Sequence, residues 1–435
     1  MRVLVVGGGG REHALAWALS RSPSVRSVAC APGNAGIAEV ASLVPVGAED
    51  VDGLVTHAAG EGYDLVVVGP EVPLALGLAD ELRERGLRVF GCSRAAAEIE
   101  GSKAFAKEVM ARAGVPTARW GAFTDEAHAA SFAGDLLRRA RRVVVKADGL
   151  AAGKGVVICD GEEQAREAIR SLLAGDLVGG AGARVVVEEF LIGREASCMA
   201  LVDGERVWPL AACEDHKTVH DGDVGPMTGG MGAISPTPVI DGALAARVER
   251  EVLAPTARAL AEAGRPFSGV LYAGLMVTAD GPRVLEFNCR FGDPETQPLL
   301  ARFEGDLGAA LLAIAEGRAP TVAFSPRAAC CVVLAARNYP GPPERPPSGT
   351  RSPAVVIEGL AEAGALEGVT VFHAGTRRVR DQVVVSGGRV LGVTATGADL
   401  PDARSRAYDA VAKIHFDGMH FRRDIGARGE PPARR

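Results

Sequence analysis

Short apolar runs alternate with amphipathic helical segments over the first hundred residues of the chain. The apolar runs lie at 2–7, 27–31, 65–69 and 87–91. Buried strands separated by helices are typical of a parallel, doubly wound sheet, which binds its ligands at the carboxyl ends of the strands. The pattern therefore predicts an N-terminal Rossmann-like domain at 1–101.

A more compact mixture of helical and strand periods follows. Ser102, as N-cap, and Gly114, as stop signal, frame its first helix. Beyond that helix we expect helices at 125–140 and 162–174 and strands at 142–147, 155–159 and 184–191. So many elements in so few residues predict a small α+β lid domain at 123–190.

Longer strands with alternating apolar and polar positions occupy 191–326, as in antiparallel sheets. Asp280-Gly281 predicts a hairpin turn within them. We expect 102–122 and 191–326 to form one main domain that carries the lid. We further expect a β-rich C-terminal domain at 327–425 and a disordered tail at 426–435. The predicted fold class is therefore a multidomain combination of α/β and α+β.

Composition narrows the functional classes. The formal net charge is −6 and no basic stripe stands out, so we expect no nucleic-acid partner. No apolar run approaches the roughly 20 residues of a transmembrane helix, and the chain opens with a strand rather than a signal segment, so we expect a cytoplasmic protein with no membrane partner. The eight cysteines lie mostly in apolar runs, which predicts reduced core thiols.

Lysine is scarce in this chain, with 42 arginines against six lysines. Lysines that persist in such a composition are enriched at positions that need a compact charge on a flexible stem. Chance survival is the competing interpretation for any single lysine. The six are Lys103, Lys107, Lys146, Lys154, Lys217 and Lys413.

The segment 143–158 reads as strand, glycine-rich loop and strand, with Lys146 and Lys154 on either side of the loop. Small residues let backbone N–H groups approach an oxyanion. The spacing differs from a Walker A loop, because Gly149 and Gly153 are one residue too close and Gly155 replaces the hydroxyl residue. The loop therefore predicts a phosphate site of another kind.

Two further segments carry polar clusters. The strand end at 185–197 places Phe190-Leu191 where a backbone could bond a purine edge, with Glu195 within reach of a ribose; surface acids are the alternative. The long loop 214–233 contains Asp215, Lys217 and five glycines, which favours a functional loop. Its two histidines lack a matching Cys/His set, so zinc is not expected.

The strand 284–291 carries an unusually polar row. Strict alternation places Val284, Glu286, Asn288 and Arg290 on one face and Leu285, Phe287, Cys289 and Phe291 on the other. A carboxylate and an amide are hard oxygen ligands that suit Mg²⁺ together with substrate phosphates. The turn at 292–297 continues the same polar face.

The N-terminal segment 5–19 is a glycine-rich turn into a helix, which is an anion site by geometry. It is not a dinucleotide fingerprint, because Glu12 stands where the third glycine is needed and the second strand lacks the ribose-binding acid. Glu71 follows another strand, where its carboxylate could hold a sugar diol.

Read together, these segments closely resemble the glycinamide ribonucleotide synthetase family, phosphoribosylamine–glycine ligases of the ATP-grasp superfamily. The resemblance covers about 1–425 and rests on "GGREHALAW", "APGNAG", "GPEVPL", "KADGLAAGKGV", "EEFLIGREAS", "TGGMGA", "EFNCRFGDPETQ" and "FHAGT". Met227 departs from it, since the family usually has Asn there, and so does Cys92, where Pro is usual.

The resemblance implies ATP-dependent ligation of glycine to 5-phosphoribosylamine through glycyl phosphate, with Mg²⁺ or Mn²⁺ as cofactor and a monomeric state. Implied metal ligands are Glu286 and Asn288. Implied ATP contacts are Lys103, Lys146, Gly149, Gly153, Lys154, Gly155, Glu188, Glu189, Phe190, Leu191 and Glu195. Implied substrate contacts are Gly9, Gly10, Arg11, Glu12, Asn34, Glu71, Gly292, Asp293, Pro294, Glu295, Thr296 and Gln297. Implied catalytic groups are Arg290, Asp215 and Lys217.

Two alternatives remain open at this stage. Another ATP-grasp ligase or carboxylase would share the glycine-rich loop and the metal pair but differ in its acceptor. A nucleotide-binding regulatory module would bind without turnover, and it should lack the complete metal row.

Overall fold

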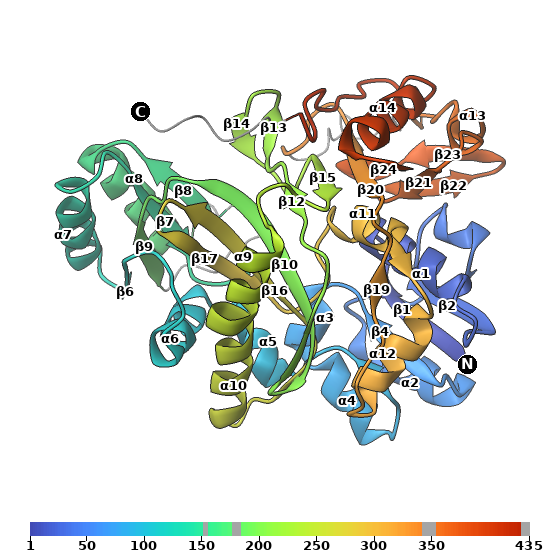
Figure 1. Ribbon diagram of the computed structural model, residues 1–435, viewed down its shortest axis with the longest axis horizontal. Coiled ribbons are helices and arrows are strands. Elements are labelled where there is room, and N and C mark those ends of the chain that lie inside the picture. The colour runs from blue at the N-terminus through green and yellow to red at the C-terminus, as the bar shows by residue number, and fades with distance from the viewer. Residues whose placement is uncertain (151–154, 176–183, 342–353, 428–435) are drawn as a thin grey trace, which may run out of the picture. The chain divides into compact units, whose positions relative to one another are not determined.

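A computed structural model describes residues 1–150, 155–175, 184–341 and 354–427. The chain divides into two compact units (Figure 1). The first unit comprises 1–91, 210–238 and 290–435, and the second comprises 92–209 and 239–289.

The first unit begins with the predicted parallel sheet, in the order β3-β2-β1-β4-β5. Its strands Val3–Val6 and Leu65–Val68 are almost fully buried, as parallel strands covered on both faces are. Its elements are β1 (Arg2–Gly7), α1 (Gly10–Ser20), β2 (Ser27–Pro32), η1 (Ile37–Glu39), β3 (Ser42–Leu43), α2 (Val51–Glu61), β4 (Leu65–Val68), α3 (Glu71–Leu76), α4 (Leu78–Glu84) and β5 (Val89–Phe90).

The second sheet of this unit is antiparallel, in the order β12-β15-β20-β24-β21. Its apolar face packs under the C-terminal helix α14. The elements of this sheet and of the rest of the unit are β12 (Glu214–Asp215), β13 (Thr218–His220), β14 (Val224–Met227), β15 (Gly232–Ser235), α11 (Thr296–Ala301), β18 (Phe303–Glu304), α12 (Leu307–Ala315), β19 (Ala323–Phe324), β20 (Ala328–Ala335), α13 (Leu360–Gly364), β21 (Val369–His373), β22 (Thr376–Val379), β23 (Gln382–Val385), β24 (Arg389–Gly397) and α14 (Leu400–Val411).

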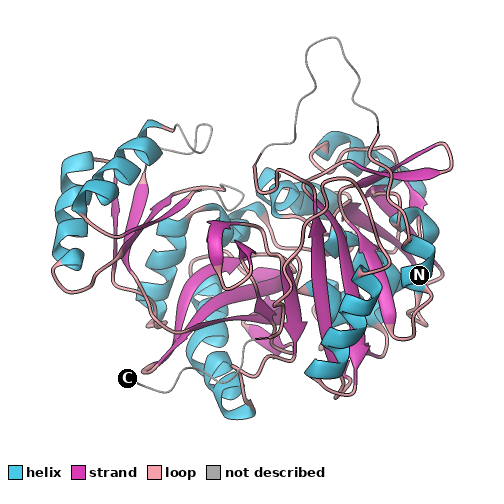
Figure 2. Cartoon of the chain, turned by 90° about the horizontal axis from the view of Figure 1, so that it is seen from above, coloured by secondary structure: helices cyan, strands magenta, loops and turns pink. Residues whose placement is uncertain are grey.

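The second unit contains two four-stranded antiparallel sheets, β6-β9-β7-β8 and β11-β10-β16-β17. Helices α7 and α8 pack against the first sheet, in the segment where the sequence predicted a lid domain, and its action as a lid stays a prediction (Figures 1 and 2). The elements are α5 (Arg94–Gly101), α6 (Lys103–Ala113), β6 (Trp120–Phe123), α7 (Glu126–Leu137), β7 (Val143–Ala147), β8 (Val156–Cys159), α8 (Glu162–Ala174), β9 (Val185–Glu189), β10 (Arg194–Gly204), β11 (Arg206–Pro209), α9 (Gly242–Val248), η2 (Glu249–Leu253), α10 (Ala254–Glu262), β16 (Phe267–Thr278) and β17 (Gly281–Asn288).

The compact units cut across the expected main domain at 191–326. The segment 210–238 contributes β12 and β15 to the sheet of the C-terminal strands, so it packs with them rather than with β10 and β16. The hairpin between β16 and β17 turns at Ala279-Asp280, one residue earlier than predicted, because Gly281 already pairs with Thr278.

The two faces predicted for 284–291 are wrong over the first half of the strand. The pairing with β16 shifts between Gly274 and Leu275, so that Leu285 is an extra residue, a β-bulge. Val284 is therefore fully buried, and Leu285 is only partly buried. Beyond the bulge the alternation holds, with Phe287 in the core.

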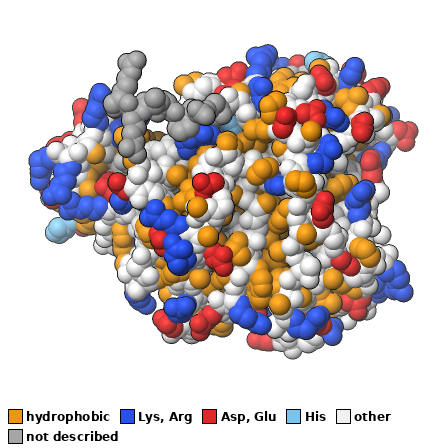
Figure 3. All heavy atoms as spheres, in the orientation of Figure 1, with side chains coloured by type: hydrophobic (Ala, Val, Ile, Leu, Met, Phe, Trp, Pro, Cys, Tyr) orange, Lys and Arg blue, Asp and Glu red, His pale blue; other side chains and the backbone are white. Residues whose placement is uncertain are grey.

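Charges of both signs are interspersed over the molecular face drawn in Figure 3. Arginines on and around α7 and α8 are paired with acids: Arg138 with Asp135, Arg142 with Asp160, and Arg170 with Glu126. Among the described residues, no helix combines the length and apolar character needed to cross a bilayer. All eight cysteines are buried, free thiols.

Two buried histidines join the parallel sheet's first helix to β21. His13 Nδ1 accepts a hydrogen bond of 2.7 Å from the His373 backbone N–H, and the rings meet edge to face. Burial, and secondarily His373, lowers the pKa of His13 from 6.5 to about 3. Burial, and secondarily Arg378, lowers the pKa of His373 to about 4.

These histidines are expected to make the protein acid-labile. Below pH 6.5 both histidines become protonated in the unfolded chain but stay neutral in the folded chain. The free energy of unfolding therefore falls by about 1.4 kcal/mol per pH unit for each histidine, down to about pH 4. His13→Asn retains a hydrogen-bond acceptor but no longer titrates. In this variant the slope of the unfolding free energy against pH, between pH 6 and 4.5, should be smaller by the contribution of one proton. Denaturant unfolding at several pH values measures the slope. His128→Gln, at an exposed histidine, should leave it unchanged; an unaltered slope in His13→Asn would contradict the assignment.

Candidate active site

The glycine-rich loop begins against the N-terminus of α6. As predicted, Ser102 caps this helix by accepting from a backbone N–H. Asp148 accepts hydrogen bonds from the Ser102 hydroxyl (3.0 Å) and from the Ala104 backbone N–H (3.1 Å). Lys103 Nζ donates to the Gly149 carbonyl at 2.9 Å. The helix thus seats the start of the loop and delivers a lysine to it.

Lys146, on β7, reaches two strands. Its Nζ lies 2.9 Å from Glu188 Oε1, on β9, and donates to the Leu285 carbonyl at 3.1 Å. The bulge in β17 therefore helps to position Lys146, because the extra residue Leu285 supplies the carbonyl that accepts its hydrogen bond. The predicted loop residues Gly153 and Lys154 lie outside the described residues, and Gly155 is buried immediately before β8.

The other predicted nucleotide contacts follow β9. Glu189 accepts from the Arg119 backbone N–H at 2.9 Å, and the Arg142 guanidinium lies 5.4 Å from the centre of the Phe190 ring. Leu191 follows, and Glu195 lies on β10 opposite Met276. A side chain at Gly193 would meet the Val277 carbonyl at 2.2 Å, so this turn requires glycine.

Glu286 and Asn288 lie on the same face of β17, beyond the bulge. Opposite Glu286 stands Gly274, where an added Cβ would come within 3.3 Å of the glutamate side chain. Burial lowers the pKa of Lys103, and the charge of Glu286 opposes this shift, so the two groups belong to one electrostatic neighbourhood. One carboxylate and one amide oxygen fit a divalent cation that takes its remaining ligands from phosphates and water.

The described residues contain no cluster of three His, Cys, Asp or Glu side chains able to hold a metal by themselves. Glu286 and Asn288 would need phosphate and water oxygens to complete the coordination of a divalent cation, and they stay the predicted metal ligands.

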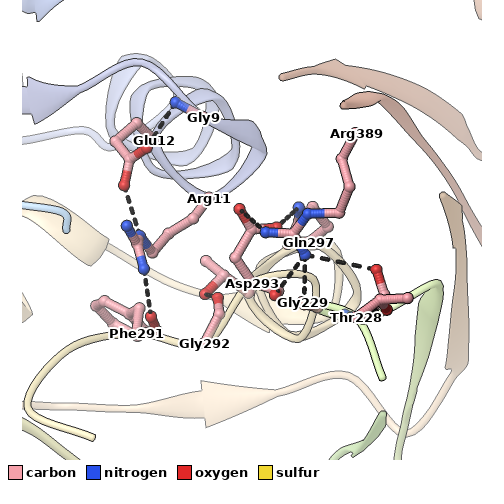
Figure 4. A network of polar contacts seen from close by, with 12 residues as sticks. Gly9, Arg11, Glu12, Thr228, Gly229, Phe291, Gly292, Asp293, Gln297 and Arg389 are labelled. Atoms are coloured by element: carbon pink, nitrogen blue, oxygen red, sulfur yellow. Dashed lines mark hydrogen bonds and ion pairs between the residues drawn. The ribbon is translucent and has the colours of Figure 1, made fainter. Parts of the chain in front are cut away.

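The acceptor-side predictions fall in the first unit, where Gly9, Asn34 and Glu71 follow β1, β2 and β4. Figure 4 shows Gly9, Arg11 and Glu12 together with the predicted turn residues Gly292, Asp293 and Gln297. Glu12 completes a capping box, since its Oε2 accepts from the Gly9 backbone N–H at 2.7 Å. Its Oε1 accepts from Arg11 Nε at 2.5 Å. Added side chains at Gly7 or Gly69 would meet Glu12 within 2.5 Å, so Glu12 fills the space beside the turn.

Asn34 makes every hydrogen bond that its amide allows. Nδ2 donates to the carbonyls of Gly8 (2.9 Å) and His373 (2.8 Å), and Oδ1 accepts from the backbone N–H groups of Gly36 and Ile37. An amide has two donors and two acceptor positions. The geometry thus favours an indirect role for Asn34, shaping the loop, and its predicted substrate contact stays a prediction.

Arg290 and Glu71 form an ion pair, with Arg290 Nε 3.1 Å from Glu71 Oε2. Burial alone would raise the pKa of Glu71, but Arg290 and then Arg11 outweigh it and lower the pKa to about 2. The carboxylate is therefore ionised at any physiological pH. Arg11 Nη1 also donates to the Phe291 carbonyl at 3.1 Å, which fixes the chain beside Arg290.

Asp293 is the centre of the network in Figure 4. Its Oδ1 accepts from Gln297 Nε2 at 2.9 Å, and its Oδ2 lies 3.2 Å from Arg389 Nη2. Arg389 Nη1 also donates to the carbonyls of Asp293 (2.8 Å) and Gly229 (2.5 Å). Burial raises the pKa of Asp293, but Arg389 and Arg11 overcome this effect and lower it.

The other residues of the predicted turn contact neighbouring parts of the first unit, and their substrate contacts stay predictions. The Thr296 hydroxyl donates to the Gly292 carbonyl at 2.5 Å, and Glu295 is 2% exposed. Pro294 lies against Gly230, where an added Cβ would approach its ring within 2.3 Å.

The segment 214–233 is not the single long loop that the sequence predicted, because it forms β12, the paired strands β13 and β14, and the first two residues of β15. Asp215 and Lys217 lie in its first part, and their catalytic roles stay predictions. Asp215 is buried on β12 and accepts from the His216 backbone N–H at 2.7 Å. A Cβ at Gly230 would approach Asp215 Oδ1 within 2.6 Å. The Lys217 carbonyl accepts from the Thr228 backbone N–H at 2.7 Å, which closes the loop at its base.

Several residues of these networks were not among the predicted site residues, and among them are three charged side chains. Lys107 pairs with Glu188, Asp148 caps α6, and Arg389 holds Asp293. The scarcity of lysine was a signal that could have found Lys107. Nothing local distinguishes Asp148 or Arg389, because their partners lie 44 and 96 residues away.

Comparison with known proteins places the chain. Residues 1–100, 101–296 and 329–428 match the N, ATP-grasp (A) and C domains of phosphoribosylglycinamide synthetase. A phosphoribosylamine–glycine ligase of Vibrio vulnificus (strain YJ016) is 48% identical over 98% of both chains. The crystal structure of phosphoribosylamine–glycine ligase from Thermotoga maritima superposes with a TM-score of 0.82 at 33% identity, covering 98% of this chain and 100% of that one.

A biotin carboxylase of Campylobacter jejuni shares the fold alone, with a TM-score of 0.71 at 15% identity over 97% of this chain and 92% of that one. The family matches span all three parts of the sequence, and the relatives are matched over nearly their whole length. The chain belongs to the phosphoribosylglycinamide synthetase family, with an ATP-grasp domain at its centre.

Proposed function

We propose that the chain acts as a phosphoribosylamine–glycine ligase, joining glycine to 5-phosphoribosylamine to give glycinamide ribonucleotide, ADP and phosphate. The observation that carries the proposal is that the two units contain different sets of predicted site residues. The predicted nucleotide and metal residues lie in the second unit, and the predicted acceptor residues lie in the first.

In the first step, a glycine carboxylate oxygen attacks the γ-phosphorus of ATP, and the bond to the β-phosphate oxygen breaks to release ADP. Carboxylate and triphosphate repel each other, so the site must place cations where charge gathers. Lys103 and Lys146 supply fixed positive charge, each held by a backbone carbonyl. A divalent cation on Glu286 and Asn288 would neutralise phosphate charge.

In the second step, the amine of 5-phosphoribosylamine attacks the carbonyl of glycyl phosphate, loses a proton and expels phosphate. Asn288 and Arg290 are two positions apart, so the covalent chain keeps a metal ligand and a cation within roughly 7 Å at their Cα atoms. Asp215 and Lys217 are proposed to orient the amine and the carboxylate. Holding both reactants in place contributes up to roughly 7–11 kcal/mol.

The decisive measurement is ADP release with glycine, offered with and without 5-phosphoribosylamine. We expect turnover to need glycine and to rise strongly when the amine is added. ADP release that ignores glycine, or that needs bicarbonate instead, would point to another ATP-grasp reaction, and no release at all would point to a binding module. The cytoplasmic location, the monomeric state and the choice between Mg²⁺ and Mn²⁺ stay predictions.

A further inference from the structure

A buried ion cluster lies behind Lys146 in the second unit. Glu188 is 1% exposed and uses both carboxylate oxygens on lysines, with Oε1 2.9 Å from Lys146 Nζ and Oε2 2.9 Å from Lys107 Nζ. Lys107 itself is 1% exposed, on α6. A side chain this deeply buried acts on a ligand only through its neighbours.

The charge balance of the cluster depends on Lys107. One carboxylate with one lysine is a neutral pair, which would offer no net charge to a triphosphate. One carboxylate shared between two lysines leaves a net charge of +1. Because Lys146 is 7% exposed and more accessible than Lys107, that excess charge is presented on the Lys146 side.

The surrounding contacts hold Lys107 in this position. Its Nζ donates to the Thr117 hydroxyl at 2.7 Å, and that hydroxyl donates to the Val284 carbonyl on β17 at 2.6 Å. Lys103 lies one helical turn earlier on α6, so the two lysines project from the same face of the helix. The cluster therefore ties α6, β7 and β9 to the strand that bears Glu286.

We propose that Lys107 is a positioning residue for nucleotide binding, which shares Glu188 so that Lys146 keeps its positive charge for the phosphates of ATP. The inference rests on the proposed function, because it takes Lys146 to face ATP. Glu188 then serves through its carboxylate as the shared counter-ion of two lysines.

Burial lowers the pKa of Lys107 to about 8, with the attraction of Glu188 opposing the shift. The pKa of Glu188 stays below its ordinary value, because Lys146 and Lys107 outweigh the effect of burial. Lys107 and Glu188 are thus both charged at neutral pH.

The test is the affinity for ATP of Lys107→Met, measured by equilibrium titration. Removing the second cation should weaken ATP binding about 30-fold, while Lys107→Arg should stay within about fivefold of the unchanged chain. The KM for glycine should stay within about threefold. Lys413→Met, at an exposed lysine of the first unit, is the matched control and should change neither value.

The double variant Lys107→Met/Glu188→Gln separates positioning from mere packing. It removes both partners and leaves Lys146 with its charge, so it should regain at least tenfold of the affinity lost in the single variant. A folded single variant with unchanged affinity, or a double variant as weak as the single one, would overturn the proposal.

A thermal melt establishes which variants fold. If Lys107→Met does not fold, the double variant alone decides. An affinity for ATP within tenfold of that of the unchanged chain supports the proposal, and a weaker affinity overturns it. Failure of the proposed function would look different, because then the unchanged chain would bind no ATP or release ADP without glycine.

Discussion

Glu286→Gln is expected to lower kcat by about 10³-fold or more while leaving the protein folded. The substitution keeps size and shape but removes the only negative charge of the proposed metal pair on β17. A neutral amide in its place would bind a hard divalent cation weakly. A thousandfold loss corresponds to about 4 kcal/mol of transition-state stabilisation, a reasonable share for a metal that neutralises transferring phosphate.

The measurement is ATP turnover over a range of Mg²⁺ concentrations, together with Mn²⁺ binding in the presence of nucleotide. Both the activity at saturating Mg²⁺ and the affinity for Mn²⁺ should fall. Glu205→Gln is a matched control, since Glu205 is exposed in the same unit and, among the described residues, forms an ion pair with Arg258. Near-normal activity of Glu286→Gln at saturating Mg²⁺ would remove Glu286 from the metal site.

Sequence reasoning succeeded where the signals are local. Helix α6 begins after Ser102 and ends at Gly114, with φ of +65° there, because both caps are properties of a few neighbouring residues. The parallel N-terminal sheet was predicted because its strands are buried on both faces and alternate with helices.

The bulge at Leu285 could not be read from the strand itself. Alternation predicts faces only while each residue pairs with one partner, and the register of β17 is set by β16. The same limit explains the unit boundaries, since 210–238 joins strands that follow it by about a hundred residues. Long-range pairing decided both features.

Resemblance to a family identifies the residues of a site more readily than it identifies what each residue does. Asn34 stands in a motif and is predicted to contact substrate; its four hydrogen bonds all go to the backbone, which favours a role in shaping the loop and leaves the substrate contact a prediction. Glu188 was predicted at the adenine site, and its carboxylate holds two lysines. Counting donors and acceptors separates these roles, and that count needs coordinates.

Arg389→Met is expected to weaken the binding of glycinamide ribonucleotide about 100-fold while the KM for ATP stays within about threefold. Arg389 begins β24 beside an irregularity in its pairing with β20, and both Val390 and Leu391 belong to the core. The guanidinium is thereby directed at the network of Asp293 and Gly229. Its loss leaves the largely buried Asp293 carboxylate without its main cation, which is costly.

The guanidinium of Arg389 contacts the Asp293 carboxylate and the backbone carbonyls of Asp293 and Gly229 at the same time. A lysine keeps the charge but cannot make all of these contacts, so Arg389→Lys should show an intermediate loss of product affinity. Arg377→Met on β22, at an exposed arginine of the same C-terminal region, serves as the control. Titration with the stable product avoids the short-lived amine and reports binding directly. Equal losses for ATP and for product would mean that Arg389 supports the fold in general, whereas a loss confined to product would show that a C-terminal residue organises the acceptor site.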